Sequence, residues 1–216
     1  MTYNQEPAKK NTKALGLVYL YTGEGKGKTS AALGTMLRAL SSGWSVTWIA
    51  FYKEASWGIS EYEFPHLLLA KHRRRLEMLL LGKGFYIQNP EEVVTRQDQA
   101  SLKVASTKQG KVTDDDTAAA HRAAAHSALA TALAKLQQPQ PPQLLILDEV
   151  CNAIADGLID EQLVLDLLVQ RQQCHVVLTG RFASERLMAH ADLVTEMKNL
   201  KHPYDQGIMA VKGLDF

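Results

Sequence analysis

The stretch LGLVYLYTGEGKGKT, residues 15–29, decides the fold that this sequence predicts. Residues 15–21 are a short apolar run, typical of a buried strand, and they lead into the glycine-rich segment 23–29. Residues 28–41 then place apolar side chains at helical spacing. A strand, a glycine-rich loop ending in Gly-Lys-Thr, and a helix together predict a loop that binds the phosphates of a nucleotide, here ATP with Mg²⁺.

Each residue type in this loop suits the chemistry of phosphate binding. The glycines, Gly23, Gly25 and Gly27, let successive backbone amides turn toward phosphate oxygens. Lys28 adds a positive charge, and Thr29 offers its hydroxyl to Mg²⁺ at the positive end of the helix dipole. The alternative is a glycine-rich turn that binds no ligand.

The loop is one residue shorter than the usual motif G-x-x-x-x-G-K-[ST]. Only three residues separate Gly23 from Gly27. We therefore expect it to bind a polyphosphate without holding it in the register of an ordinary ATPase or kinase.

A second acidic signal lies later in the chain. The apolar residues 144–147 predict a strand that leads into Asp148 and Glu149. Carboxylates at the carboxyl end of a parallel strand can hold Mg²⁺ or its water ligands. Asp-Glu pairs also occur as ordinary helix caps, but together with the loop this pair indicates a metal site formed by Thr29, Asp148 and Glu149.

The rest of the chain alternates between strand-like and helix-like segments. This alternation predicts an α/β fold with a mostly parallel sheet, helices on both faces, and a ligand site along the carboxyl edge. Further strands are expected at residues 45–52, 176–179, 193–197 and 208–211, and further helices at residues 63–81, 117–136, 160–172 and 184–189.

Length and composition are those of an ordinary globular protein. The chain has 216 residues, 46% of them hydrophobic and 22% charged. We expect a flexible tail over residues 1–14, one domain over 15–216, and an irregular insertion at about 88–113. The formal charge of +1 gives no reason to expect nucleic-acid binding. The polar N-terminus and the lack of a long apolar run predict a cytoplasmic protein without a membrane span.

Several polar residues have simpler interpretations than a site. We interpret the basic run 71–75 as a solvated helix face, with phosphate or nucleic-acid binding as the alternative. His121 and His126 do not share a helix face, so we expect packing or surface roles. We expect Cys151 to be a small buried residue, and His202 to serve either a turn or the site.

Three stretches of this sequence resemble the bacterial P-loop ATP:corrinoid (cob(I)alamin) adenosyltransferases. They are TGEGKGKTSAALGTMLRAL at 22–40, LLILDEVCNAIADGLID at 144–160, and VVLTGRFASERLMAHADLVTEMKNLKHPYDQGIMAVKGLDF at 176–216. The third is the most diagnostic. The resemblance implies a RecA-like P-loop fold, usually as a homodimer, with a flavodoxin-like reductant as a possible partner.

The resemblance also implies a reaction. In that family a reduced Co(I) corrinoid attacks C5′ of ATP, and triphosphate leaves. By this match Lys28, Thr29 and Glu149 would be catalytic, and Thr29 and Glu149 would hold the metal. Lys26 and Ser30 would add phosphate contacts, and Arg181 would lie near the nucleotide.

The match departs from the family pattern in the middle of the chain. Phe85 and Tyr86 stand where family aromatics pack under the corrin, but Ile87 replaces a tryptophan. Glu54 stands where the family tends to have glycine, and Glu24 puts a negative charge beside the phosphates. Two alternatives stay open: an ATP-binding regulatory protein of the same fold that has lost corrinoid chemistry, and a conventional ATPase or kinase.

Overall fold

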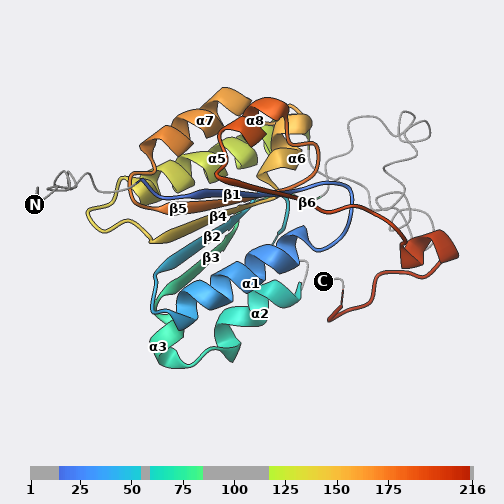
Figure 1. The fold of residues 1–216 in the computed structure, drawn as a ribbon, viewed down its shortest axis with the longest axis horizontal. Helices are drawn as coiled ribbons and strands as arrows, with labels where there is room; N and C mark the ends of the chain where they lie inside the picture. The colour runs from blue at the N-terminus through green and yellow to red at the C-terminus, as the bar shows by residue number, and fades with distance from the viewer. Residues whose placement is uncertain (1–14, 55–58, 85–116, 215–216) are drawn as a thin grey trace, which may run out of the picture.

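The fold is built around one parallel sheet. The computed structural model describes residues 15–54, 59–84 and 117–214. Within these residues six strands lie in the order β3-β2-β4-β5-β1-β6, and every neighbouring pair is parallel (Figure 1). The strands are β1 (Val18–Thr22), β2 (Val46–Ala50), β3 (Leu76–Leu80), β4 (Leu144–Asp148), β5 (His175–Thr179) and β6 (Leu193–Glu196).

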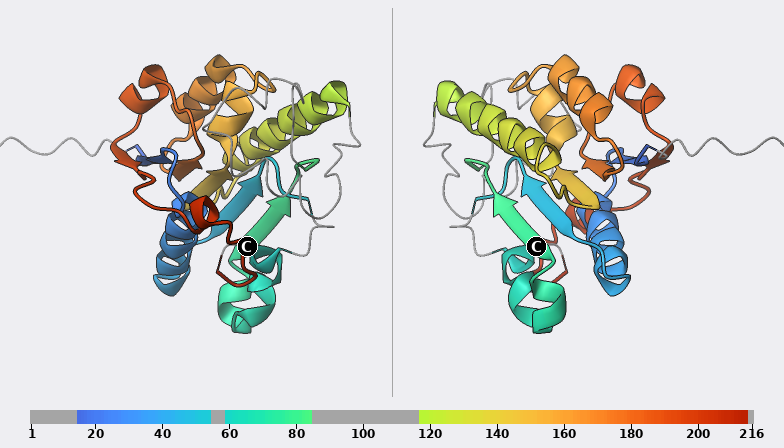
Figure 2. Two further views of the ribbon diagram at one scale, coloured as in Figure 1. Left: turned by 90° about the vertical axis from the view of Figure 1, so that its right-hand side faces the viewer. Right: turned by 90° about the vertical axis from the view of Figure 1, so that its left-hand side faces the viewer.

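Helices cover both faces of this sheet. Helices α1 and α2 lie on one face, and α5, α6, α7 and α8 lie on the other; Figure 2 shows α1 and α5 on opposite sides of the sheet from both ends. The helices are α1 (Lys28–Ser41), α2 (Ser60–Leu67), α3 (Ala70–Arg73), α5 (Ala118–Leu136), α6 (Val150–Ala155), α7 (Glu161–Gln170), α8 (Glu185–Ala189) and the 3₁₀ helix η4 (Pro203–Gln206). The predicted α/β fold is confirmed.

The central strand β4 shows why the sequence folds this way. All five of its residues are buried, as expected for a parallel strand covered on both faces. Leu145 and Leu147 pack in the core under α5 and α7, whereas Leu144 and Ile146 pack in the core under α1. A continuous apolar run is therefore required here, because successive side chains enter opposite cores.

Most predicted elements are confirmed to within a few residues, but two predictions are wrong. The predicted helix over 63–81 is instead α2, α3 and the strand β3. Pro65 lies inside α2, and the apolar residues after Arg75 pair with β2 rather than continue a helix. The segment 208–211, predicted as a strand, has no regular structure and follows η4.

Other expectations lie partly outside the described residues. The predicted tail 1–14 and the predicted insertion at 88–113 are among the parts that the structure does not describe, as are Phe85 and Tyr86, which we predicted to contact a corrinoid. Within the described residues, no helix combines the length and apolar character that crossing a bilayer requires.

Candidate phosphate- and metal-binding site

The glycine-rich loop lies between β1 and α1, as the sequence predicts. Gly27 has a positive φ of 110° and directly precedes the first helical residue, Lys28. This conformation is readily available only to glycine. The first amides of α1 point back toward the loop, which is the arrangement that favours anion binding.

Lys28 folds over its own loop. Its ammonium donates hydrogen bonds to the carbonyl oxygens of Gly23 at 2.7 Å and Gly25 at 2.6 Å. Burial and the nearby Arg181 lower the pKa of Lys28 to about 8, although Glu24 and other acidic groups oppose the shift. The loop therefore holds its positive charge in a partly desolvated position.

The segment after β6 packs directly on this loop. The Gly25 amide donates to the carbonyl oxygen of Met197 at 2.7 Å, and the Met197 amide donates to Thr22 at 2.8 Å. A Cβ at Gly23 would lie 2.5 Å from the Met197 carbonyl oxygen, and one at Gly25 would lie 2.7 Å from that of Lys198. These glycines thus have a second role that the sequence did not suggest: they allow two backbone segments to touch.

Asp148 and Glu149, at the carboxyl end of β4, form what we call the acidic edge, and Asp148 lies at its centre. Its side chain is fully buried at the end of β4. The hydroxyls of Thr29 and Thr179 donate to Oδ1 at 3.1 Å and 2.6 Å, and the Lys53 ammonium binds Oδ2 at 2.9 Å. The structure thus brings Thr29 and Asp148, two of the three residues predicted to bind the metal, into direct contact.

Lys53 and Thr179 are site residues that our sequence reasoning missed. Each lies at or just after the carboxyl end of a strand adjacent to β4, namely β2 and β5. Their positions next to strand ends were the available signal. To distinguish them from other residues near strand ends, one must know that β2 and β5 flank β4, and the sequence motifs do not specify this strand order.

Glu149 follows Asp148 in an unusual backbone conformation, with φ of 65°. Its amide donates to the Thr179 hydroxyl at 2.9 Å. Burial, and then the charge of Asp148, raise the pKa of Glu149 to about 7, while Lys53 opposes the shift. A nearby cation would favour the ionised carboxylate, so Glu149 is suited to respond to a metal ion.

Arg181 connects the end of β5 to the loop. Its guanidinium lies 3.4 Å from the Glu24 carboxylate, and its amide donates to Asn152 at 2.9 Å. The negative charge of Glu24 therefore has a cationic partner within the site. Gly180 is needed here, because a Cβ would lie 2.6 Å from the Asn152 side-chain oxygen.

The remaining predicted phosphate contacts lie on the loop and the start of α1. Lys26 and Ser30 are both exposed to solvent. The ammonium of Lys26 is nevertheless partly desolvated by the protein around it, which lowers its pKa. The structure describes the chain up to Gly84, immediately before the predicted corrinoid residue Phe85.

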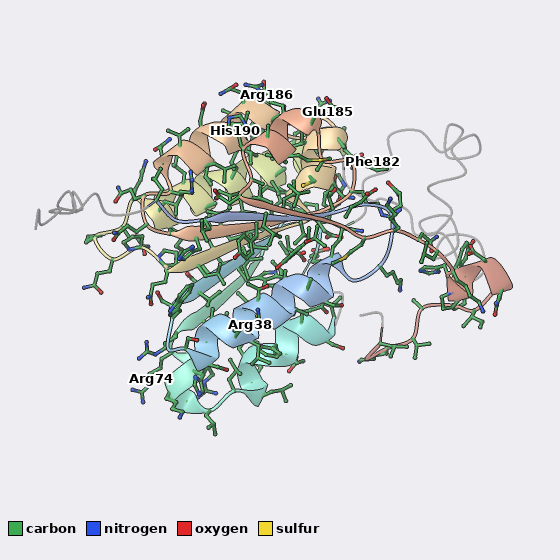
Figure 3. The ribbon with its side chains drawn as sticks, in the orientation of Figure 1. Arg38, Arg74, Phe182, Glu185, Arg186 and His190 are labelled. Carbon is green, nitrogen blue, oxygen red and sulfur yellow. The ribbon has the colours of Figure 1, made fainter. Side chains whose placement is uncertain are left out.

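The residues with simpler interpretations lie away from this edge or within the core. Cys151 is buried, as expected, and His121 is buried in α5 while His126 is exposed. His202 accepts a hydrogen bond from the Tyr204 amide at 3.1 Å and caps η4, which is a turn role. In Figure 3, Arg74 of the basic run lies at the opposite end of the molecule from Phe182, which follows Arg181.

The donor set fits a Mg²⁺ ion that is shared with a nucleotide. Among the described residues, no group of three or more His, Cys, Asp or Glu side chains could hold a metal ion by itself. Phosphate-loop sites differ from such clusters, because Mg²⁺ there takes a hydroxyl, a carboxylate and phosphate oxygens. Thr29 donates its proton to Asp148, which leaves its oxygen lone pairs for a cation.

Comparison with known proteins extends this picture. Residues 14–216 match the family described as ATP:corrinoid adenosyltransferase BtuR/CobO/CobP. A corrinoid adenosyltransferase of Sinorhizobium sp is 32% identical over 208 residues, covering 95% of this chain and 82% of that protein. A corrinoid adenosyltransferase of Escherichia coli K12 is 29% identical over 202 residues, covering 93% and 86%.

A solved structure with some likeness is the flagellar accessory protein FlaH from Methanocaldococcus jannaschii. It has a TM-score of 0.43 and 12% sequence identity, and the match covers 84% of this chain and 70% of that one.

Proposed function

The chain belongs to the ATP:corrinoid adenosyltransferase family, and we propose that it transfers the 5′-deoxyadenosyl group of Mg-ATP to the cobalt of a reduced corrinoid. In this reaction Co(I) donates an electron pair to C5′ and a Co–C bond forms. The bond between C5′ and the bridging oxygen breaks, and that oxygen leaves as part of triphosphate. The observation that carries the proposal is the hydrogen bond between Thr29 and Asp148. Thr29 directly follows Lys28, whose ammonium binds a carbonyl oxygen of the phosphate loop.

The loop would stabilise the leaving triphosphate. Negative charge grows on the bridging oxygen as its bond to C5′ breaks, so positive groups fixed nearby lower the barrier. Lys28 supplies such a charge, and its partly desolvated position strengthens the attraction. Lys26, Ser30 and Arg181, with the amides of Gly23 and its neighbours, would add further phosphate contacts. The amide of Gly25 is engaged by Met197, so the contribution of Gly25 would come from the shape of the loop.

Three residues would hold Mg²⁺. The hydroxyl of Thr29 would bind it directly, with the carboxylates of Asp148 and Glu149 binding it or its water ligands. The ion would supply charge that neutralises the triphosphate. Asp148 is fixed by three hydrogen-bonding partners, so this edge is organised before any ligand arrives.

We also propose that Phe85 and Tyr86 contact the corrinoid. They directly follow Gly84, which leaves the carboxyl end of β3 at the same edge of the sheet as the phosphate loop. The family further supports a homodimer, a reductant of the flavodoxin type, and a cytoplasmic location as proposals for this chain.

The products of ATP consumption test the proposed function. Purified protein would be given ATP, Mg²⁺ and chemically reduced cobalamin without oxygen. We expect equal amounts of triphosphate and adenosylated cobalamin, measured by ion chromatography and absorbance. The Lys28→Met variant serves as the control and should form neither. Release of ADP would indicate a conventional ATPase, and ATP binding without any product would indicate a regulatory protein.

A further inference from the structure

The buried ammonium of Lys53 links Asp148, at the carboxyl end of β4, to Glu61 in helix α2. The ammonium of Lys53 lies 2.9 Å from Oδ2 of Asp148 and 3.1 Å from Oε1 of Glu61. The Asp148 side chain is fully buried, and those of Lys53 and Glu61 are each only 13% exposed. These three side chains form a carboxylate–ammonium–carboxylate chain, which we call the Lys53 bridge.

The backbone of Lys53 is held as firmly as its side chain. Its carbonyl oxygen accepts a hydrogen bond from the Gly82 amide at 3.1 Å, and the neighbouring Tyr52 carbonyl accepts one from Gly84 at 2.9 Å. A Cβ at Gly82 would lie 2.2 Å from the Tyr52 carbonyl carbon. The ammonium is therefore presented to Asp148 from a fixed point, directly beside the residues that lead to Phe85.

We propose that Lys53 and Glu61 are positioning residues that orient the Asp148 carboxylate for the metal ion. Lys53 holds Oδ2, so that Oδ1 faces Thr29, and Glu61 holds Lys53 in place from the first turn of α2. This inference rests on the proposed function, since it concerns how the same site prepares its metal ligands.

The energetics of the Lys53 bridge favour a positioning role over a purely stabilising one. A buried ion pair adds little net stability, because desolvation of the charges offsets their attraction. Oε2 of Glu61 is buried and has no hydrogen-bond donor among the described residues, which adds a further cost. The Lys53 ammonium contacts both carboxylates, so the bridge presents a positive charge to Asp148 from a fixed position.

The test is the effect of Mg²⁺ on ATP binding, measured by calorimetry with Mg²⁺ and again in EDTA. Residues that orient metal ligands typically contribute roughly 10- to 100-fold to metal affinity. We expect Lys53→Met to weaken Mg-ATP binding by that factor and metal-free ATP binding by less than about twofold. Glu61→Gln still accepts a hydrogen bond from Lys53 but loses its charge, so it should show a smaller shift in the same direction. Lys53→Arg should recover part of the loss.

The matched control is Lys135→Met. It breaks another ion pair, Lys135 with Glu77 at 2.6 Å, which joins α5 to β3 and includes no residue of the site. We expect both ATP affinities to stay unchanged in this variant. Equal weakening with and without Mg²⁺ in Lys53→Met, or no weakening in either bridge variant, would overturn the inference. If Lys53→Met does not fold, Glu61→Gln decides alone.

The failures of the two proposals are distinguishable. If the wild-type protein forms neither triphosphate nor adenosylated cobalamin in the product assay, the proposed function itself fails. If Mg²⁺ strengthens binding in the wild type and to the same extent in both bridge variants, only the positioning role fails.

Discussion

The backbone amide of Gly25 donates a 2.7 Å hydrogen bond to the carbonyl oxygen of Met197, and this contact joins the phosphate loop to the segment that follows β6. The two segments touch without intervening side chains. In Figure 1 the loop between β1 and α1 and the C-terminal segment both lie on the right-hand side of the molecule. The shape of the loop therefore depends on residues near the other end of the chain.

The Gly25→Ala variant should disrupt this contact. The added methyl group would lie 2.7 Å from the Lys198 carbonyl oxygen and 2.8 Å from that of Met197, so the two backbones would have to separate. Overpacking of this kind costs about 1–3 kcal/mol of stability. We expect a loss of that size in urea unfolding, together with weaker ATP binding in calorimetry.

Gly34→Ala is the control for that variant. Gly34 lies within α1, and an added Cβ would have no heavy atom of the described residues within 4 Å apart from the adjoining residues and backbone of its own helix. Alanine at such a position should raise stability by about 0.5–1 kcal/mol. A Gly25→Ala protein that is as stable as the wild type and binds ATP equally well would show that the two segments can separate freely.

The affinity for ATP should fall as the pH rises above about 8. Burial, followed by Arg181, lowers the pKa of Lys28 to about 8 in the free protein, so its ammonium loses its proton from that pH upward. A bound polyphosphate favours the charged form. Binding is thus strongest below pH 8 and weakens above it, by at most about tenfold per pH unit.

Calorimetry between pH 7.5 and 9.5, an interval that includes the Lys28 pKa of about 8, would measure this dependence. EDTA would be present to remove metal effects. Lys28→Met provides the comparison. It should bind ATP more weakly throughout and show no further decline over the same interval. A wild-type affinity that stays constant across this range would mean that the charge of Lys28 does not contribute to binding.

Thr179→Val should destabilise the protein, although the side chains of threonine and valine have nearly the same shape. The Thr179 hydroxyl donates to Asp148 at 2.6 Å and accepts from the Glu149 amide at 2.9 Å. Valine would leave both groups without this partner at a buried position, and each loss costs about 1–3 kcal/mol. Urea unfolding should show the change.

Thr131→Val is the matched control for that loss. The Thr131 hydroxyl donates to the Ser127 carbonyl oxygen one turn earlier in α5, at an exposed site. We expect its stability to change by less than about 0.5 kcal/mol. If the two valine variants were equally stable, the Asp148 carboxylate and the Glu149 amide would not need the Thr179 hydroxyl as a hydrogen-bond partner.

The site residues that the sequence predicted are those whose signal is local. The loop 23–29 and the pair Asp148 and Glu149 are short contiguous patterns, and each lies beside an apolar run that forms a strand. Lys53 and Thr179 reach Asp148 only because β2 and β5 flank β4. That order is a long-range property of the fold, so no pattern within either strand could reveal these partners.

The wrong prediction over residues 63–81 has a related cause. Apolar residues such as Leu76, Met78 and Leu80 suit either a helix or a strand, and their spacing alone does not decide. The choice of a strand is made by β2, because its edge away from β4 pairs in register with five residues of β3. Tertiary pairing therefore overrode local spacing here.

Phe182 offers a last test, because its backbone is held in a conformation that phenylalanine disfavours. Its φ is 59° and its side chain is 48% exposed, next to Arg181. Figure 3 shows it on the same side of the molecule as the loop between β1 and α1. The left-handed conformation costs an L-residue about 1–2 kcal/mol, while glycine adds an entropic cost of about 0.5–1 kcal/mol. Phe182→Gly should thus be equally stable or more stable by up to about 1.5 kcal/mol in urea unfolding.

Gln172→Gly separates strain relief from a role at the site. Gln172 also has a positive φ, of 49°, but it lies at the opposite end of β5 from the acidic edge. Both glycine variants should show the same change in stability. Strain kept at a functional position is expected to serve that function, so only Phe182→Gly should lose ATP affinity. If Phe182→Gly is destabilised while Gln172→Gly is not, packing of the ring outweighs the strain. If both bind ATP like the wild type, the strained residue has no part in nucleotide binding.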